Sequence, residues 1–182
     1  MIAYAPYLIL LLPLVSAVLT RLFLYPFPRI AVTSSVVACL LSFCGSLWLL
    51  GSGTPAGGMA APPVMWIEFG GLKANFGLVA DPLARMMAAL VTGVAFLVHI
   101  YSIGYLSKDP SRSRFFGELS LFVFSMLGIV FSDNLVTMFI FWELVGLSSY
   151  LLIGFWFDRP AAGAAANKAF LVNRIGDFGF IL

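Results

Sequence analysis

The sequence predicts an all-α integral membrane protein with about six transmembrane helices and a small β-hairpin between the second and third helices. Of its 182 residues, 62% are apolar and only 10% are charged, whereas a soluble domain is roughly 45–50% apolar and about 25% charged. Apolar stretches long enough to cross a bilayer, which takes about 20 residues, occur along the whole chain. They are continuous rather than alternating, which disfavours a transmembrane β-barrel.

The first two predicted spans lie before residue 51. The first runs from about Ile2 to Leu24, and we expect a retained helix because it lacks the basic segment of a signal peptide. It ends at Pro26, since proline does not continue a helix. The second span runs from Ile30 to Leu50 and carries no charge.

The segment from residue 51 to residue 81 has the composition of a loop. Two short alternating runs within it, Trp66–Phe69 and Leu72–Phe76, flank the pair Gly70-Gly71. A Gly-Gly pair between two such runs is typical of a β-hairpin. We expect this hairpin to lie on the membrane surface.

Four further spans are predicted after this loop. The third begins at Asp81-Pro82, which supplies an N-cap and a proline at the first helical position, and continues to about Leu106. The other three run from about Phe115 to Phe131, from after Ser132-Asp133 to near Phe157, and from Ala161 to Leu182.

Positive charges are concentrated in the odd-numbered connections between the spans. These residues are Arg21, Arg29, Lys108, Arg112, Arg114 and Arg159. Because cytoplasmic loops are enriched in Lys and Arg, we expect these connections to be cytoplasmic and the N-terminus to face outward. Arg85 lies near the outer end of the third span, where we expect its side chain to snorkel to the interface.

Several kinds of partner are disfavoured by composition. A net charge of +2 gives no clustered basic face for nucleic acid. The two cysteines, Cys39 and Cys44, do not have the spacing of an iron–sulfur or zinc site, and we expect both to be small buried residues. The sequence therefore predicts a protein of the lipid bilayer with no nucleic-acid partner and no metal or cofactor in this chain.

Glu143 is the strongest candidate for a functional residue. It lies near the middle of the fifth span, with no positive charge within one turn of it. A charge at that depth costs roughly 2.5–3.5 kcal/mol on insertion scales, and intramembrane ionisable residues usually have a function. A carboxylate balanced between desolvation and a nearby cation can take up and release a proton. The alternative is a structural glutamate in a permanent ion pair.

The third and sixth helices carry further ionisable side chains. Arg174 and Asp177 lie three residues apart and therefore share a helix face. Together they either line a hydrated path or tune Glu143, or they form a self-neutralised pair that only fixes helix packing. Lys168 either joins this path or snorkels to the cytoplasmic side. His99 either relays protons or is a hydrogen-bonded packing residue.

Two predictions concern the surroundings of single side chains. Trp142 is expected in the protein core, because it lies in the middle of a span. Glu118 lies near the cytoplasmic start of the fourth span, and we expect it at the membrane interface rather than in the interior.

Four motifs in this sequence carry a family resemblance. They are Asp81-Pro82-Leu83, Val98–Tyr105, Phe141–Trp156 and Lys168–Asp177. Together they resemble subunit L of bacterial NADH–quinone oxidoreductase (complex I), whose mitochondrial counterpart is chain 5. The resemblance covers nearly the whole chain and is weakest over the first two helices and the Gly/Pro-rich loop.

The resemblance implies a membrane-arm subunit that translocates protons in the bacterial inner membrane, with other membrane-arm subunits as partners. Glu143 would be its proton-channel residue, with Asp177, Arg174, His99 and Lys168 in supporting roles. NADH, FMN, iron–sulfur clusters and quinone would bind other subunits, so the chain itself would hold no redox site. Residues 1–80 would form the N-terminal helix pair and loop, and residues 81–182 the start of the proton-channel bundle.

The chain departs from this family in length. Members are much longer, contain two inverted helical repeats, and pair the glutamate with a lysine on a later broken helix. We therefore expect a fragment or truncated reading frame that does not pump alone. The alternatives are a subunit of a multi-subunit sodium/proton antiporter or bicarbonate-uptake system, and a non-functional membrane stub.

Overall fold

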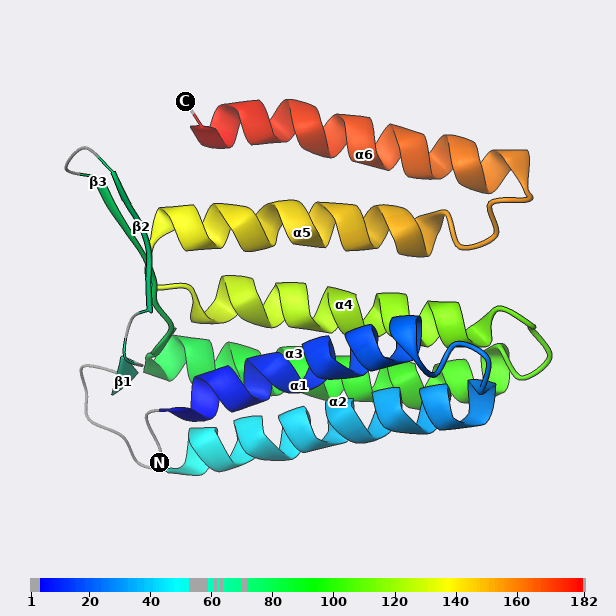
Figure 1. Ribbon diagram of the computed structural model, residues 1–182, viewed down its shortest axis with the longest axis horizontal. Coiled ribbons are helices and arrows are strands. Elements are labelled where there is room, and N and C mark those ends of the chain that lie inside the picture. The colour runs from blue at the N-terminus through cyan, green and yellow to red at the C-terminus, as the bar shows by residue number, and fades with distance from the viewer. Residues whose placement is uncertain (1–3, 53–58, 61, 63, 70–71, 182) are drawn as a thin grey trace.

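The computed structural model describes residues 4–52, 59–60, 62, 64–69 and 72–181. Within these residues, six long helices lie side by side and alternate in direction along the chain (Figure 1). They are α1 (Ala5–Leu22), α2 (Pro28–Gly51), α3 (Pro82–Tyr105), α4 (Arg112–Phe131), α5 (Leu135–Ile153) and α6 (Pro160–Ile181). The predicted all-α class is confirmed.

The helices α1 to α5 are long and apolar enough to cross a membrane. The sixth helix, α6, has 22 residues, but it carries Lys168, Arg174 and Asp177. Helix α5 ends at Ile153, earlier than predicted, with Gly154 as its C-cap residue. Helix α4 begins at Arg112, earlier than predicted.

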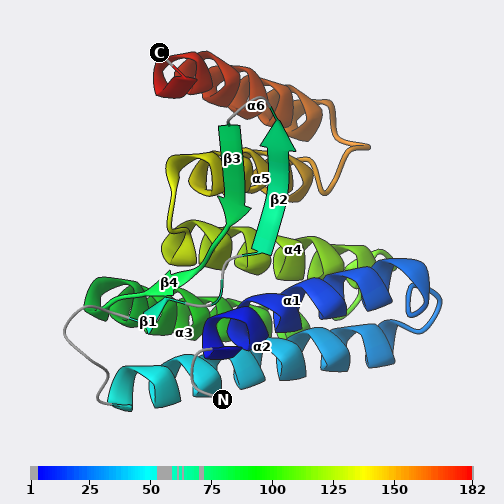
Figure 2. The ribbon, with the colours of Figure 1, turned by 60° about the vertical axis from the view of Figure 1, so that its left-hand side comes forward.

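The helices form a group of four with two further helices added on one side. Helices α1 to α4 pack against one another, α5 packs against α4, and α6 packs against α5 (Figures 1 and 2). Small residues let these helices approach closely. A Cβ atom at Gly128 of α4 would collide with the Phe141 ring of α5, and Ser42 of α2 donates to the Ile9 carbonyl of α1 at 3.1 Å.

The predicted hairpin is confirmed as a strand pair. Strand β2 (Val64–Phe69) pairs antiparallel with β3 (Leu72–Phe76), while Gly70-Gly71 lie outside the described residues. A second pair joins β1 (Met59–Ala60) to β4 (Val79–Ala80). The β2–β3 pair crosses one end of the helices (Figures 1 and 2), where Asn134 at the start of α5 donates to the Asn75 carbonyl at 2.9 Å.

The predicted start of α3 is confirmed, because Asp81 Oδ1 accepts a hydrogen bond from the Ala84 N–H at 2.6 Å. Two expectations nearby were wrong. Arg85 does not snorkel: it is buried, and its Nε donates to the Ala80 carbonyl at 3.2 Å. The adjacent strand β4 supplies this acceptor inside the protein. Cys39 is buried as expected, but Cys44 is exposed.

The three odd-numbered connections lie at one end of the molecule, on the right in Figure 1. We call this the basic end. It carries Arg21, Arg29, Lys108, Arg112, Arg114 and Arg159. The opposite end carries the strand pairs and the start of α3. The fold thus separates the two ends by charge in the way that the loop composition predicts.

Candidate functional site

Glu143 lies at the middle of α5, and its partner comes from the neighbouring helix. The Glu143 carboxylate forms an ion pair with the guanidinium of Arg174 on α6. The Glu143 side chain is 20% exposed, whereas that of Arg174 is 43% exposed. An arginine on the next helix therefore supplies a cation directly beside Glu143.

The same guanidinium also contacts a second carboxylate. Arg174 Nη1 lies 3.7 Å from Asp177 Oδ2, and the Asp177 side chain is 9% exposed. Glu143, Arg174 and Asp177 therefore form a triad with two acids and one base. When all three groups are ionised the triad carries one net negative charge, so one proton can neutralise it.

Trp142 completes the site, and its predicted place in the core was wrong. Its side chain is exposed, and its indole Nε1–H donates to Asp177 Oδ1 at 3.0 Å. An indole N–H usually finds an acceptor, but the sequence alone does not show that Asp177 lies at the same depth on the next helix. Phe170 was also missed: Arg174 Cζ lies 4.8 Å from the centre of its ring, in a cation–π contact.

The triad borders a cavity of about 460 Å³ between α4, α5 and α6. Its polar lining comes from the triad and Asn173, and its apolar lining includes Met126 of α4. Gly146 of α5 also lines this cavity, and a Cβ built there would lie at ordinary contact distance, 3.8 Å from Asn173 Nδ2. A cavity of this size with several polar partners can hold water.

His99 lies in a separate polar network. It is buried on α3, where Nδ1 lies 2.8 Å from the Ala95 carbonyl oxygen and Nε2 lies 3.0 Å from Ser35 Oγ, both within hydrogen-bond distance. Ser35 Oγ lies 2.6 Å from Ser120 Oγ, so the network links α2, α3 and α4. In the described part of the chain, no hydrogen bond or ion pair joins it to the triad.

Lys168 lies closer to the basic end than the triad does. It is on α6, six residues before Arg174, which places it roughly 9 Å away along the helix axis. Its side chain is exposed. No ion pair of Lys168 is found among the described residues.

Two family models match the chain, and together they span the triad and the motifs before it. The model described as NADH-ubiquinone oxidoreductase (complex I), chain 5 N-terminus, matches residues 66–116. The model described as the NADH:quinone oxidoreductase/Mrp antiporter transmembrane region matches residues 132–182. Subunit L of NADH-quinone oxidoreductase from Mycobacterium tuberculosis is 54% identical over 114 residues. The chain belongs to the complex I chain 5/subunit L family.

Other members of this family show how much of a relative the chain covers. NAD(P)H-quinone oxidoreductase subunit 5 from the chloroplast of Anthoceros angustus is 58% identical over 117 residues, which are 64% of this chain and 16% of that protein. The M. tuberculosis subunit L match covers 63% of this chain and 18% of that protein. The chain therefore spans less than a fifth of the length of these subunit L and chain 5 relatives.

Solved structures share the fold of this family member. The Mrp complex from Dietzia sp. aligns with a TM-score of 0.79 and 26% identity, over 97% of this chain and 18% of that one. An archaeal membrane-bound sulfane sulfur reductase aligns with a TM-score of 0.76 and 20% identity, over 94% of this chain and 34% of that one. The latter likeness concerns the fold alone.

Proposed function

We propose that this chain is part of a membrane-arm subunit of NADH–quinone oxidoreductase, and that the whole subunit translocates protons while other subunits transfer electrons from NADH to quinone. The main support for this proposal is the Glu143–Arg174–Asp177 triad, which lies beside a cavity. Glu143 is at the middle of α5, which corresponds to the middle of the proposed membrane span. It lies in a region matched by the NADH:quinone oxidoreductase/Mrp antiporter model. The redox groups are proposed to bind other subunits of that complex.

The triad suggests how a proton is held and released. A cation beside a carboxylate favours its ionised form, and a low-dielectric environment favours the neutral form. When the Arg174 guanidinium contacts Glu143, it stabilises the ionised carboxylate of Glu143. When the guanidinium turns toward Asp177, the Glu143 carboxylate loses this cation and binds a proton. Arg174 contacts both acids, so a modest side-chain movement is enough to shift its charge between them. Lys168, about 9 Å from Arg174 along α6 toward the basic end, is proposed to act at that flank of the triad, whereas His99 is proposed to stabilise the packing of α2, α3 and α4.

Substitution of Glu143 by Gln in the full-length protein within its complex tests this proposal. Gln keeps the size of the side chain but removes its ability to exchange a proton. Proton translocation per electron, measured in sealed vesicles, is expected to fall sharply while electron transfer from NADH is still detectable. An unchanged proton-to-electron ratio would overturn the proposal. Asp158→Asn, which changes an exposed acid in the connection between α5 and α6 outside the site, serves as the matched control.

A sodium/proton antiporter subunit is the second candidate, and one observation favours it. The structure from the Mrp complex covers 97% of this chain. Against it stands the 53–58% identity to oxidoreductase subunits. Sodium-dependent proton movement in the absence of NADH and quinone would select the antiporter.

The topology is proposed from the charge distribution. The basic end faces the cytoplasm by the positive-inside rule, which places the N-terminus outside, in a bacterial inner membrane. Residues 81–182 then begin the helical bundle of the proton channel. Labelling of a single cysteine introduced at Lys108 by an impermeant reagent, before and after the membrane is opened, tests this orientation.

A further inference from the structure

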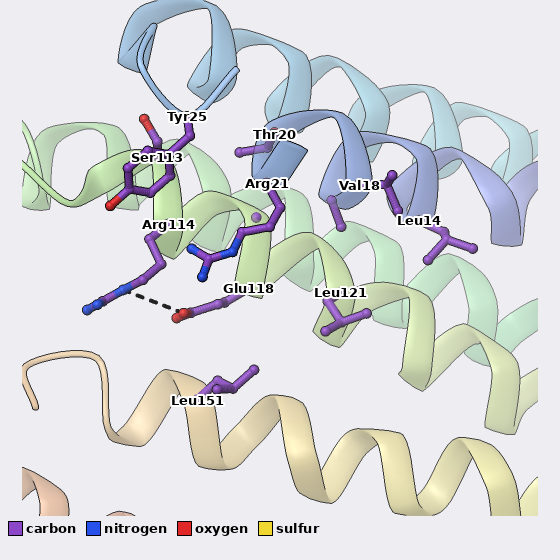
Figure 3. Close-up of a pocket in the computed structure, with 12 residues that line it drawn as sticks. Leu14, Val18, Thr20, Arg21, Tyr25, Ser113, Arg114, Glu118, Leu121 and Leu151 are labelled. Atoms are coloured by element: carbon purple, nitrogen blue, oxygen red, sulfur yellow. Dashed lines mark ion pairs between the residues drawn. The ribbon is translucent and has the colours of Figure 1, made fainter. Parts of the chain in front are cut away.

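A second cavity lies at the basic end, between α1 and α4 and next to α5. Its volume is about 290 Å³ (Figure 3). Its long walls are apolar and come from all three helices, with Leu14 and Val18 on α1, Leu121 on α4 and Leu151 on α5. Arg21, Arg114 and Glu118 add charged groups to this apolar groove (Figure 3).

Buried polar atoms that line this cavity have no partner. Thr20 is 1% exposed and Ser113 is 2% exposed, yet neither hydroxyl has a hydrogen bond to the residues that the structure describes. Glu118 Oε2 is buried and unbonded in the same way, so the Glu118 side chain faces the cavity. Buried polar groups are almost always hydrogen-bonded, so these atoms indicate that the cavity holds a polar group.

The charges at the cavity are arranged as a pair of opposite sign. Arg114 Nε lies 3.5 Å from Glu118 Oε1, and its Nη2 donates to the Phe155 carbonyl, so this guanidinium is already engaged. Arg21 extends from α1 toward Glu118 (Figure 3), and it forms no ion pair with any described residue. The cavity therefore offers one available cation, Arg21, and one available anionic oxygen, Glu118 Oε2.

We propose that this cavity binds a phospholipid whose headgroup carries both a phosphate and a primary ammonium group, as in phosphatidylethanolamine. The phosphate accepts hydrogen bonds from Arg21 and from the hydroxyls of Thr20 and Ser113. The ammonium donates to Glu118 Oε2. An acyl chain follows the apolar walls toward Leu14. This assignment gives a hydrogen-bond partner to the hydroxyls of Thr20 and Ser113 and to Glu118 Oε2.

Other occupants fit the cavity less well. A phosphatidylglycerol headgroup has no cation for Glu118, and a choline headgroup has no N–H to donate. Water satisfies the hydroxyls but not the apolar walls. The aminophospholipid combines both requirements.

The lipid cavity is distinct from the Glu143 triad. Glu118 lines the lipid cavity, and Met126 lines the cavity beside the triad. These two residues lie eight positions apart on α4. That separation corresponds to roughly 12 Å along the axis. Substitutions at Arg21 or Ser113 therefore leave the triad contacts in place.

The test uses the full-length protein in its complex, transferred into nanodiscs of defined phospholipid and then washed with detergent. Retained phosphatidylethanolamine per protein is measured by mass spectrometry. We expect Arg21→Gln to lower retention about tenfold, in line with the loss of a charge-assisted hydrogen bond, and Arg21→Lys to restore part of it. Lys108→Gln removes a charge from the same end but outside the cavity, and retention should be unchanged.

Selectivity provides a second readout. Glu118→Gln should abolish the preference for phosphatidylethanolamine over phosphatidylglycerol, because the ammonium loses its anionic partner. If Arg21→Gln fails to assemble, Ser113→Ala takes its place with a smaller loss of retention. The proposal is overturned if no phospholipid is retained and a cysteine at position 21 cross-links to protein instead. It is also overturned if Glu118→Gln lowers proton translocation while lipid retention and selectivity stay unchanged.

Discussion

The carboxylate of Glu143 on α5 is paired with the guanidinium of Arg174 on α6, and the same guanidinium lies 3.7 Å from Asp177. One cation is thus shared between two intramembrane acids on adjacent helices. The guanidinium of Arg174 is within ion-pair distance of both acids in the same arrangement.

Arg174→Gln should lower proton translocation more than Arg174→Lys does. Gln removes the charge that both acids share, whereas Lys keeps the charge but loses the planar guanidinium. Coupling energies within such networks reach about 0.5–3 kcal/mol, so the Gln variant is expected to lose roughly tenfold in rate. Proton uptake by vesicles containing the full-length protein provides the measurement. Equal rates for the two variants would show that the charge of Arg174 is not used.

Trp142→Phe should destabilise the α5–α6 contact. The change removes the indole N–H that donates to Asp177 Oδ1 at 3.0 Å. Hydrogen bonds to charged groups contribute about 1.5–3 kcal/mol, and we expect about 1 kcal/mol here because the indole is exposed. A double-mutant cycle with Asp177→Ala, read from unfolding free energies, isolates this pair. Additive effects would mean that the hydrogen bond contributes nothing.

His99→Leu should lower stability without lowering proton translocation. The substitution removes the bonds from the imidazole to Ala95 and Ser35, at a cost of about 1–3 kcal/mol. Thermal unfolding and proton uptake are measured on the same preparation, with Ser35→Ala as a variant of the same network. Loss of proton uptake with an unchanged unfolding temperature would instead place His99 on the proton path.

Gly128→Ala should be destabilising, whereas Gly146→Ala should be tolerated. A Cβ at Gly128 would collide with the Phe141 ring, but one at Gly146 would lie at ordinary contact distance, 3.8 Å from Asn173 Nδ2. Overpacking of this kind costs about 1–3 kcal/mol. Unfolding temperatures of the two variants in the same detergent make the comparison. Similar temperatures would contradict the close α4–α5 approach.

Asp81→Ala should cost about 1 kcal/mol, and Asp81→Ser should recover most of the loss. Asp81 caps α3 by accepting from the Ala84 N–H at 2.6 Å, and serine retains an acceptor at this position. The free energy of unfolding measures both variants. If serine and alanine were equally destabilising, the cap would not be the cause.

Local sequence signals located the elements well because each is set by a few neighbouring residues. Asp81-Pro82 fixed the start of α3, and the two alternating runs predicted the β2–β3 pair. The predicted boundaries differed from the observed ones by a few residues, as at the end of α5, where Gly154 is the C-cap residue. The depth of Glu143 also followed from the sequence, since position within a continuous apolar span is a count of residues.

Environments of single side chains were predicted less well. Arg85 was expected to extend to the membrane interface but is buried. Trp142 was expected in the core but is exposed. Glu118 was expected at the interface and lies against a cavity between α1 and α4. In each case the deciding group belongs to another element: strand β4 for Arg85, α6 for Trp142 and α1 for Glu118. Residue spacing within one helix carries no information on such partners.

The sequence by itself determined a multi-pass helical membrane protein, the hairpin between its second and third helices, the concentration of positive charge at one end, and an acid at the middle of the fifth helix. The tertiary structure decided that Arg174 is the partner of Glu143, that Asp177 and Trp142 complete that site, and that His99 belongs to a different network. The physical reason is that apolar length and capping are local properties of the chain. Which side chains meet depends on the rotation and depth of each helix relative to its neighbours, and these are set by packing between residues far apart in the sequence.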